Sequence, residues 1–165
     1  TFNNIGFSKL GYLSLFENKL LKKNLLQKSK NQFLKPKIIY YSNLFNKCKI
    51  NSCIDISDSL FFSLKELSLQ SKKKFFINNL IGISPVLFKN LELNEYYRLI
   101  LSSGEEFIPV FTGKLTRQNI QNFKLNGINL IKIGNVQKGS GVTYQDLKNF
   151  KDNTFNHFRN TYSIL

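Results

Sequence analysis

The sequence predicts an α+β fold in which a small mixed sheet packs with helices, and observations near the middle of the chain support this. Residues 96–102 (YYRLILS) and 107–112 (FIPVFT) are β-rich runs separated by a short polar loop that contains a glycine. Two such runs are typical of a hairpin, which we expect over 96–112. Residues 128–134 return to alternation after a helical period and predict a further strand.

Apolar residues at helical spacing predict helices around this sheet. Residues 116–125 form one such segment, and another follows Ser57 or Asp58, either of which is a suitable N-cap. Residues 8–27 predict an amphipathic basic helix, and Thr143 opens a last one. The side chains that we expect to be buried together are Phe107, Val110, Ile120, Phe123 and Ile131.

Charge is distributed unevenly along the chain. Residues 1–82 carry 14 Lys against four acids, a net charge of +10, whereas residues 83–165 carry a net charge of +4. No acid lies between Glu17 and Asp55. This asymmetry predicts a basic helical N-terminal arm over 1–37 and a single α+β domain over 38–165.

The net charge of +14 indicates an anionic partner, either nucleic acid or anionic lipid. Lys outnumbers Arg by 21 to 3, and a lysine ammonium suits phosphate oxygens better than base edges. We therefore expect contacts with an RNA backbone and not reading of its sequence. The candidate RNA-binding residues are Lys22, Lys23, Lys28, Lys30, Lys35, Lys37, Lys72, Lys73, Lys74, Arg117 and Lys138.

Residues suited to acid–base or metal chemistry are scarce. His157 is the single histidine, and Cys48 and Cys53 are five positions apart, so these residues cannot close a zinc site by themselves. We expect free thiols and neither a metal nor a cofactor. Glu105 and Glu106 are adjacent, so their side chains should diverge on a solvated turn and should not form a paired-carboxylate site.

The glycine-rich segment 134–141 (GNVQKGSG) leaves two interpretations open. It is expected to link a strand to a helix, and a helix N-terminus beside Lys138 can hold a phosphate. The alternative is an ordinary connection whose glycines relieve backbone strain.

These observations together favour a non-catalytic structural component of a large ribonucleoprotein. The enriched residues have A/T-rich codons, which points to an A/T-biased genome, as organellar and some protist or parasite genomes are. We favour an organellar (mitochondrial) ribosome, in the matrix or in another organelle. Its partners would be ribosomal RNA and neighbouring proteins, with no transmembrane segment. The alternative is a soluble-side accessory subunit of an organellar membrane complex, and a small enzyme is a third interpretation.

Overall fold

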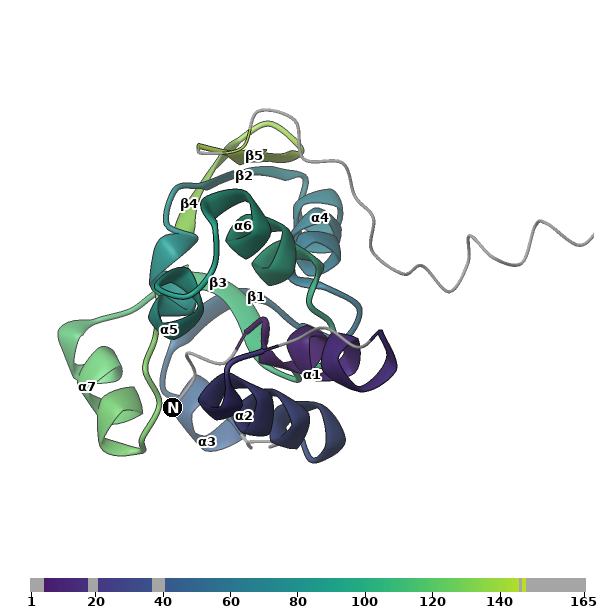
Figure 1. The fold of residues 1–165 in the computed structure, drawn as a ribbon. Coiled ribbons are helices and arrows are strands. Elements are labelled where there is room, and N and C mark those ends of the chain that lie inside the picture. Colours follow the sequence, from purple (N-terminus) through teal and green to yellow (C-terminus); the bar gives the residue numbers. More distant parts are fainter. Residues whose placement is uncertain (1–4, 18–20, 37–40, 146, 148–165) are drawn as a thin grey trace, which may run out of the picture.

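A computed structural model describes residues 5–17, 21–36, 41–145 and 147, which form helices and short strands (Figure 1). The helices are α1 (Phe7–Phe16), α2 (Lys23–Leu34), α3 (Ser42–Phe45), α4 (Leu60–Ser71), α5 (Pro85–Phe88), α6 (Leu93–Ser102) and α7 (Arg117–Leu125), with a 3₁₀ turn, η1, at Ile81–Ile83. The strands are β1 (Lys49–Asp55), β2 (Lys73–Ile77), β3 (Pro109–Lys114), β4 (Gly134–Lys138) and β5 (Val142–Tyr144). No helix among these residues is long and apolar enough to cross a membrane.

The strands form two small sheets. β1 and β3 pair antiparallel as a two-stranded ribbon. In the second sheet β2 is central, antiparallel to β4 and parallel to β5. The predicted α+β class is therefore confirmed at the level of mixed helices and small sheets.

The hairpin predicted over 96–112 is wrong. Residues 96–102 belong to α6, where Tyr96, Tyr97, Leu99, Ile100 and Leu101 are buried. A short apolar run cannot be assigned to strand or helix by its period alone, and here the helix buries the run against α4 and α5.

The other predicted boundaries of the sheet also shift. β3 pairs with β1, more than fifty residues earlier, and Pro109 lies opposite Asp55. The strand expected over 128–134 is irregular up to residue 133, and β4 begins only at Gly134. Ile133 O still accepts from Asn78 N at 3.0 Å, so this segment lies beside the end of β2 without forming a regular ladder.

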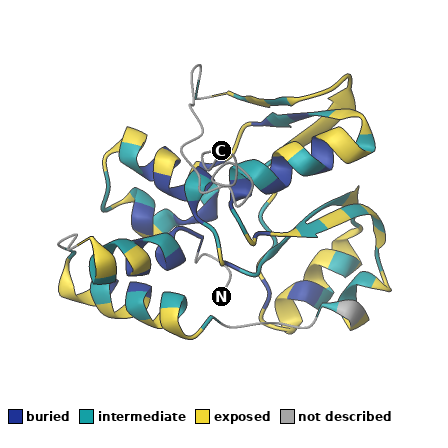
Figure 2. Ribbon diagram, turned by 90° about the vertical axis from the view of Figure 1, so that its right-hand side faces the viewer, coloured by how far each residue is buried: buried dark blue, intermediate teal, exposed yellow. Residues whose placement is uncertain are grey.

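The main core lies where α4, α6 and β2 meet, and Figure 2 shows buried residues gathered where the elements face one another. Tyr96 is its largest fully buried side chain. The Tyr96 hydroxyl donates to Leu80 O at 2.8 Å and accepts from Ser84 N at 3.2 Å. It therefore satisfies backbone groups around η1 that would otherwise be unpaired in the interior.

The predicted helix over 8–27 is two helices that pack against each other. α1 ends at Phe16, and α2 begins at Lys23. The two backbones approach closely at Gly11, where an added Cβ would lie 2.3 Å from Ser29 O. Only a residue without a side chain fits this crossing.

A second, smaller core lies under α7. Phe123 is 1% exposed and packs with Ile128, Phe45 and their neighbours. The expected burial of Ile120 is wrong, because this side chain is 49% exposed on α7. Phe107, Val110 and Ile131 are only half-buried, so the predicted five-residue core is correct at Phe123 alone.

Replacement of Phe123 with Ala should lower the free energy of unfolding by about 3–5 kcal/mol, because it leaves a cavity beneath α7. Ile120→Ala on the same helix is the matched control, since this exposed side chain should cost at most about 0.5–1 kcal/mol. Urea unfolding of both variants measures the difference. Equal losses would contradict the observed orientation of α7.

Candidate functional site

Two segments distant in sequence cross at the centre of the molecule, and we call them the double loop: residues 56–59, between β1 and α4, and residues 103–107, between α6 and β3. The N–H groups of Glu106 and Phe107 both donate to Ile56 O at 3.1 Å. Ile56 N in turn donates to the backbone just after the second segment, at Ile108 O. The two loops are therefore joined through their backbones and hold each other in place.

The second segment of the double loop is strained. Glu105 (φ 53°) and Phe107 (φ 51°) both have left-handed backbone conformations that residues with a side chain rarely adopt. An added Cβ at Gly104 would lie 2.1 Å from Asp58 O, so the two loops can cross only at a glycine. Strain of this kind persists where the surrounding structure enforces it, and it gathers at functional sites.

Glu106 is a fully buried carboxylate beneath this crossing. Its Oε1 accepts from Gly6 N at 2.7 Å and from Ser103 Oγ at 2.6 Å, with a further backbone hydrogen bond from Ser8. Its Oε2 has no hydrogen-bond partner among the described residues. Burial raises the pKa of Glu106 to about 7, although the three hydrogen bonds act to lower it.

The prediction that Glu105 and Glu106 lie together on a solvated turn is therefore wrong for Glu106. The two side chains do diverge, as adjacent residues should, but Glu105 is exposed whereas Glu106 enters the interior. The N–H groups at the start of α1 attract the carboxylate, because a helix N-terminus favours negative charge. The only sequence signal was the adjacent Ser103-Gly104 pair, which permits a tight turn.

The double loop presents polar side chains to solvent around the start of α4. Ser57 and Glu105 are exposed, and Asp58 is half-buried. Ser59, and not the predicted Ser57 or Asp58, caps α4, since its Oγ accepts from Phe62 N at 3.0 Å. Carboxylate and hydroxyl oxygens next to a helix N-terminus suit a magnesium–phosphate ligand.

The oxygen donors at the double loop do not make a complete metal cage. Among the described residues, no group of three or more His, Cys, Asp and Glu side chains could hold a metal ion. Magnesium typically keeps several waters and binds through one or two carboxylates together with substrate phosphates. Asp58 and Glu105 fit that pattern and would need a phosphate ligand to complete it.

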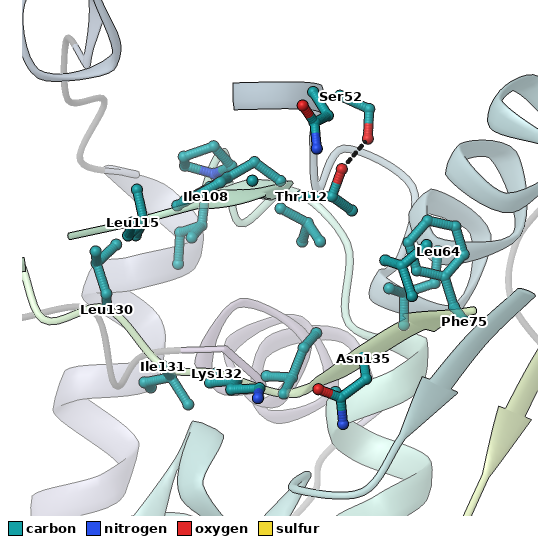
Figure 3. A pocket seen from close by; sticks show the side chains of 18 of the residues that line it. Ser52, Leu64, Phe75, Ile108, Thr112, Leu115, Leu130, Ile131, Lys132 and Asn135 are labelled. Atoms are coloured by element: carbon teal, nitrogen blue, oxygen red, sulfur yellow. Dashed lines mark hydrogen bonds between the residues drawn. The ribbon is translucent and has the colours of Figure 1, made fainter. Parts of the chain in front are cut away.

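A cleft of about 1020 Å³ separates the β1–β3 ribbon from residues 128–136 (Figure 3). Ser52 and Thr112 are joined by a 2.7 Å hydrogen bond on one wall, and Leu130, Ile131 and Lys132 contribute to the other. Its described lining contains no Asp, Glu, His or Cys. The cleft can hold an apolar group, and the titratable side chains in its lining are Tyr41 and lysines.

The lysines predicted to bind RNA fall into separate groups. Lys22, Lys23, Lys28, Lys30 and Lys35 lie on or next to α2, and Lys37 is outside the described residues. In that group, Lys28 Nζ lies 4.2 Å from the Phe7 ring centroid, and burial lowers the pKa of this ammonium.

The remaining predicted cations lie elsewhere on the molecule. Arg117 is exposed at the start of α7. Lys72, Lys73, Lys74 and Lys138 come together where β2 begins and β4 ends.

Segment 134–141 does not join a strand to a helix. Residues 134–138 are β4, residues 139–141 form a turn, and β5 follows at Val142–Tyr144. Thr143, predicted to open the last helix, is thus part of a strand, and no helix follows Lys138 within the described residues, so the predicted phosphate site at a helix N-terminus is not formed there. The part of that predicted helix from residue 148 onward lies outside the described residues. His157 lies outside the described residues. Cys48 and Cys53 are both free.

Comparison with known proteins relates the chain to kinases. It is 34% identical over 164 residues to thiamine-monophosphate kinase of Nitrosopumilus maritimus and 33% identical over 168 residues to that of Buchnera aphidicola. These alignments cover 93% and 94% of the chain but 51% and 50% of the relatives, so the chain spans about half the length of the curated proteins that it matches. No family model matches the chain.

Solved structures share the fold. AaThiL complexed with AMPPCP and TMP superposes with a TM-score of 0.72 at 23% identity, covering 93% of this chain and 48% of that one. Thiamine-monophosphate kinase from Stenotrophomonas maltophilia K279a gives a TM-score of 0.71 at 18% identity, covering 86% of this chain and 47% of that one. The described α+β arrangement is therefore found within proteins of about twice this length.

These relatives contradict the ribosomal interpretation. The prediction of a structural component that binds ribosomal RNA among neighbouring proteins is wrong, because the matched proteins are kinases. The prediction that the chain is no enzyme is wrong for the same reason. The net charge and the scarcity of histidine had favoured the ribosomal interpretation. A phosphotransferase needs charge positioning more than an imidazole, so scarce histidine does not exclude one.

Replacement of Glu106 with Gln should change how stability depends on pH. The pKa of Glu106 is higher in the folded protein than in the unfolded chain, where it is near 4.5. The folded state therefore binds more protons between pH 4.5 and about 7, and its stability falls as pH rises through that window. The shift corresponds to about 3 kcal/mol at roughly 1.4 kcal/mol per pKa unit.

Urea unfolding of wild type and Glu106→Gln across this window isolates the effect, because other titrating groups cancel in the difference. Wild type should lose stability relative to the variant as pH rises. Glu92→Gln, which alters an exposed carboxylate, should run parallel to wild type. A constant difference between wild type and Glu106→Gln would show that Glu106 keeps an ordinary pKa.

Proposed function

We propose that this chain forms one half of a kinase that transfers a phosphoryl group from ATP to thiamine monophosphate. The observation that supports it most directly is identity of 34% and 33% to two thiamine-monophosphate kinases along more than nine-tenths of the chain. The fold shared with AaThiL, whose structure contains AMPPCP and TMP, is consistent with the same proposal.

The reaction forms one bond and breaks one. A phosphate oxygen of thiamine monophosphate attacks the terminal phosphorus of ATP, and the bond from that phosphorus to the bridging oxygen breaks. The products are thiamine diphosphate and ADP. Such transfers need little covalent help from the protein, which acts by positioning the phosphates and stabilising their charge.

The double loop suits this task. Asp58 and Glu105 are carboxylates on two segments whose backbones cross, so the crossing fixes the relative position of the two backbones that carry them. Magnesium, when bound with the nucleotide, neutralises phosphate charge. The Asp58 and Glu105 carboxylates would hold it, and the positive end of the α4 dipole would face phosphate oxygens.

Glu106 stabilises the double loop from the interior of the protein. It ties the start of α1 to the second segment of the double loop through Gly6 N and Ser103 Oγ. The loop conformation that displays Glu105 therefore depends on a buried carboxylate next to it in the chain. Glu106 positions the site and does not face the substrate.

Activity is best tested in a chimera in which this chain replaces the matched half of the Nitrosopumilus maritimus kinase. The chimera should form thiamine diphosphate from thiamine monophosphate and ATP, measured by chromatography. Cooperative unfolding would show that the chimera is folded. A folded chimera that makes no product even at high concentrations of thiamine monophosphate and ATP would contradict the proposal.

Within that chimera, Asp58→Asn and Glu105→Gln should each lower kcat by about 10²-fold, the usual loss when a charge-stabilising group at a reacting centre is removed. Glu92→Gln is the matched control, because Glu92 lies at the opposite end of α6 from the double loop. It should retain full activity. If all three variants keep full activity, the double loop does not take part in the reaction.

A further inference from the structure

A cluster of four lysines lies away from the double loop, and neither the proposed reaction nor the core explains it. Lys72 ends α4, Lys73 and Lys74 begin β2, and Lys138 ends β4. Figure 1 shows this edge of the three-stranded sheet on the far side of the molecule from α1 and α2. The 12 residues of α4 span about 18 Å between its Ser59 cap and Lys72, so the cluster is separate from the double loop.

The two strands bring like charges directly together. Lys73 lies opposite Lys138 in the antiparallel pair of β2 and β4, and both are exposed. Opposite residues in such a pair have Cβ atoms about 5 Å apart, and like charges there are destabilising. None of the four lysines forms an ion pair with a described carboxylate.

The cluster also includes a residue with an unusual backbone conformation. Lys72 adopts a left-handed conformation (φ 51°, ψ 43°) as C-cap of α4, a position that favours glycine. A cation there is favoured by the helix C-terminus. That argument explains Lys72 but leaves the opposed Lys73 and Lys138 without a counter-charge among the described residues.

The cluster is held on a rigid frame. Ser68, which is 2% exposed, donates to Lys73 O at 2.7 Å and accepts from Gly141 N at 2.9 Å. Gly141 O accepts from Phe75 N at 2.9 Å, which ties the turn after Lys138 to β2. Because the frame is fixed before any ligand arrives, little conformational entropy is lost on binding.

The surface beside the lysines is open. An added Cβ at Gly141 would meet nothing within 4 Å, and one at Gly139 would meet only the Lys74 stem, at 3.6 Å. An anion can therefore reach the ammonium groups and approach the turn closely.

We propose that Lys72, Lys73, Lys74 and Lys138 form a binding site for a ligand with two or more linked phosphoryl groups. Compact ammonium charges suit phosphate oxygens, and a multiply charged anion relieves the repulsion between Lys73 and Lys138. A soluble polyphosphate and a phosphorylated lipid headgroup share this chemistry. The site stands apart from the proposed kinase reaction and does not depend on it.

The test uses the full chain and inorganic tripolyphosphate at low ionic strength. The double variant Lys73→Gln/Lys138→Gln should bind it about tenfold more weakly than wild type, since two exposed charge pairs together amount to about that factor. Lys23→Gln/Lys35→Gln removes the same net charge from α2 and is the matched control. It should bind like wild type.

Thermal unfolding gives an independent readout. Without anion, Lys73→Gln/Lys138→Gln should unfold at a higher Tm than wild type, because the repulsion is gone. With tripolyphosphate the order should reverse, since only wild type gains stability from the ligand. The control variant should show neither effect.

Phosphatidylcholine vesicles with and without phosphatidylinositol bisphosphate separate the two sources. If cosedimentation requires both the phosphorylated lipid and the lysine pair, the ligand is a lipid headgroup. If the chain binds tripolyphosphate but does not cosediment with these vesicles, the ligand is a soluble polyphosphate. If the two double variants lose affinity equally for both probes, or if neither probe binds, the proposal is overturned. Equal retention of both variants on generic RNA would attribute any anion binding to net charge alone.

Discussion

The buried carboxylate of Glu106 is the interaction on which the arrangement around the double loop depends. It joins the first residues of α1 to the segment that leaves α6, and these segments are about a hundred residues apart. A charge without full compensation in the interior is costly, so such a group persists only where its hydrogen bonds bring together elements that hydrophobic contact alone would leave free to slide. Lys9 strengthens the same junction, because its Nζ lies 2.7 Å from Ser102 Oγ.

Hydrophobic packing by itself would position these elements less accurately. The apolar core consists of Leu and Ile together with Phe and Tyr, and cores of this kind tolerate several arrangements of similar volume. Directional contacts remove this freedom. The Tyr96 hydroxyl fixes η1 relative to α6, Ser68 fixes the turn after β4, and Glu106 fixes α1. In each case a polar group inside the protein selects one arrangement among several that the apolar surface would allow.

Features that follow from local sequence pattern were predicted correctly, whereas features that depend on contacts with other elements were not. The α+β class and the burial of Phe123 follow from local pattern, and both are confirmed. Residues 96–102 were assigned to a strand because an apolar run of seven residues has no distinctive period. Its helical state is decided by what covers it, and the covering residues lie in α5 and also in α1 and α4, which are distant in the chain.

The candidate site was missed for a related reason. Glu105 and Glu106 look alike in sequence, and only the backbone crossing at Ile56 separates an exposed carboxylate from a buried one. The net charge, in contrast, is evident from the sequence, but it does not identify the anionic partner. A +14 balance states that an anion is attracted but not which one. Ribosomal RNA was inferred from the lysine clusters and the A/T-rich codons, and neither observation identifies the anion.

The close approach at Gly104 has a consequence for how this chain can change over time. Glycine has G/C-rich codons, and residues of that kind are scarce here, with nine glycines among 165 residues. A mutational bias that erodes glycine acts everywhere, yet at Gly104 and Gly11 any replacement would drive a methyl group into a backbone carbonyl. Gly82 differs, since its nearest neighbours are side-chain atoms of Asn79 that can move aside. Glycines such as Gly11 and Gly104 therefore mark places where two stretches of backbone touch, so in a chain of this composition a glycine that persists can locate a backbone crossing.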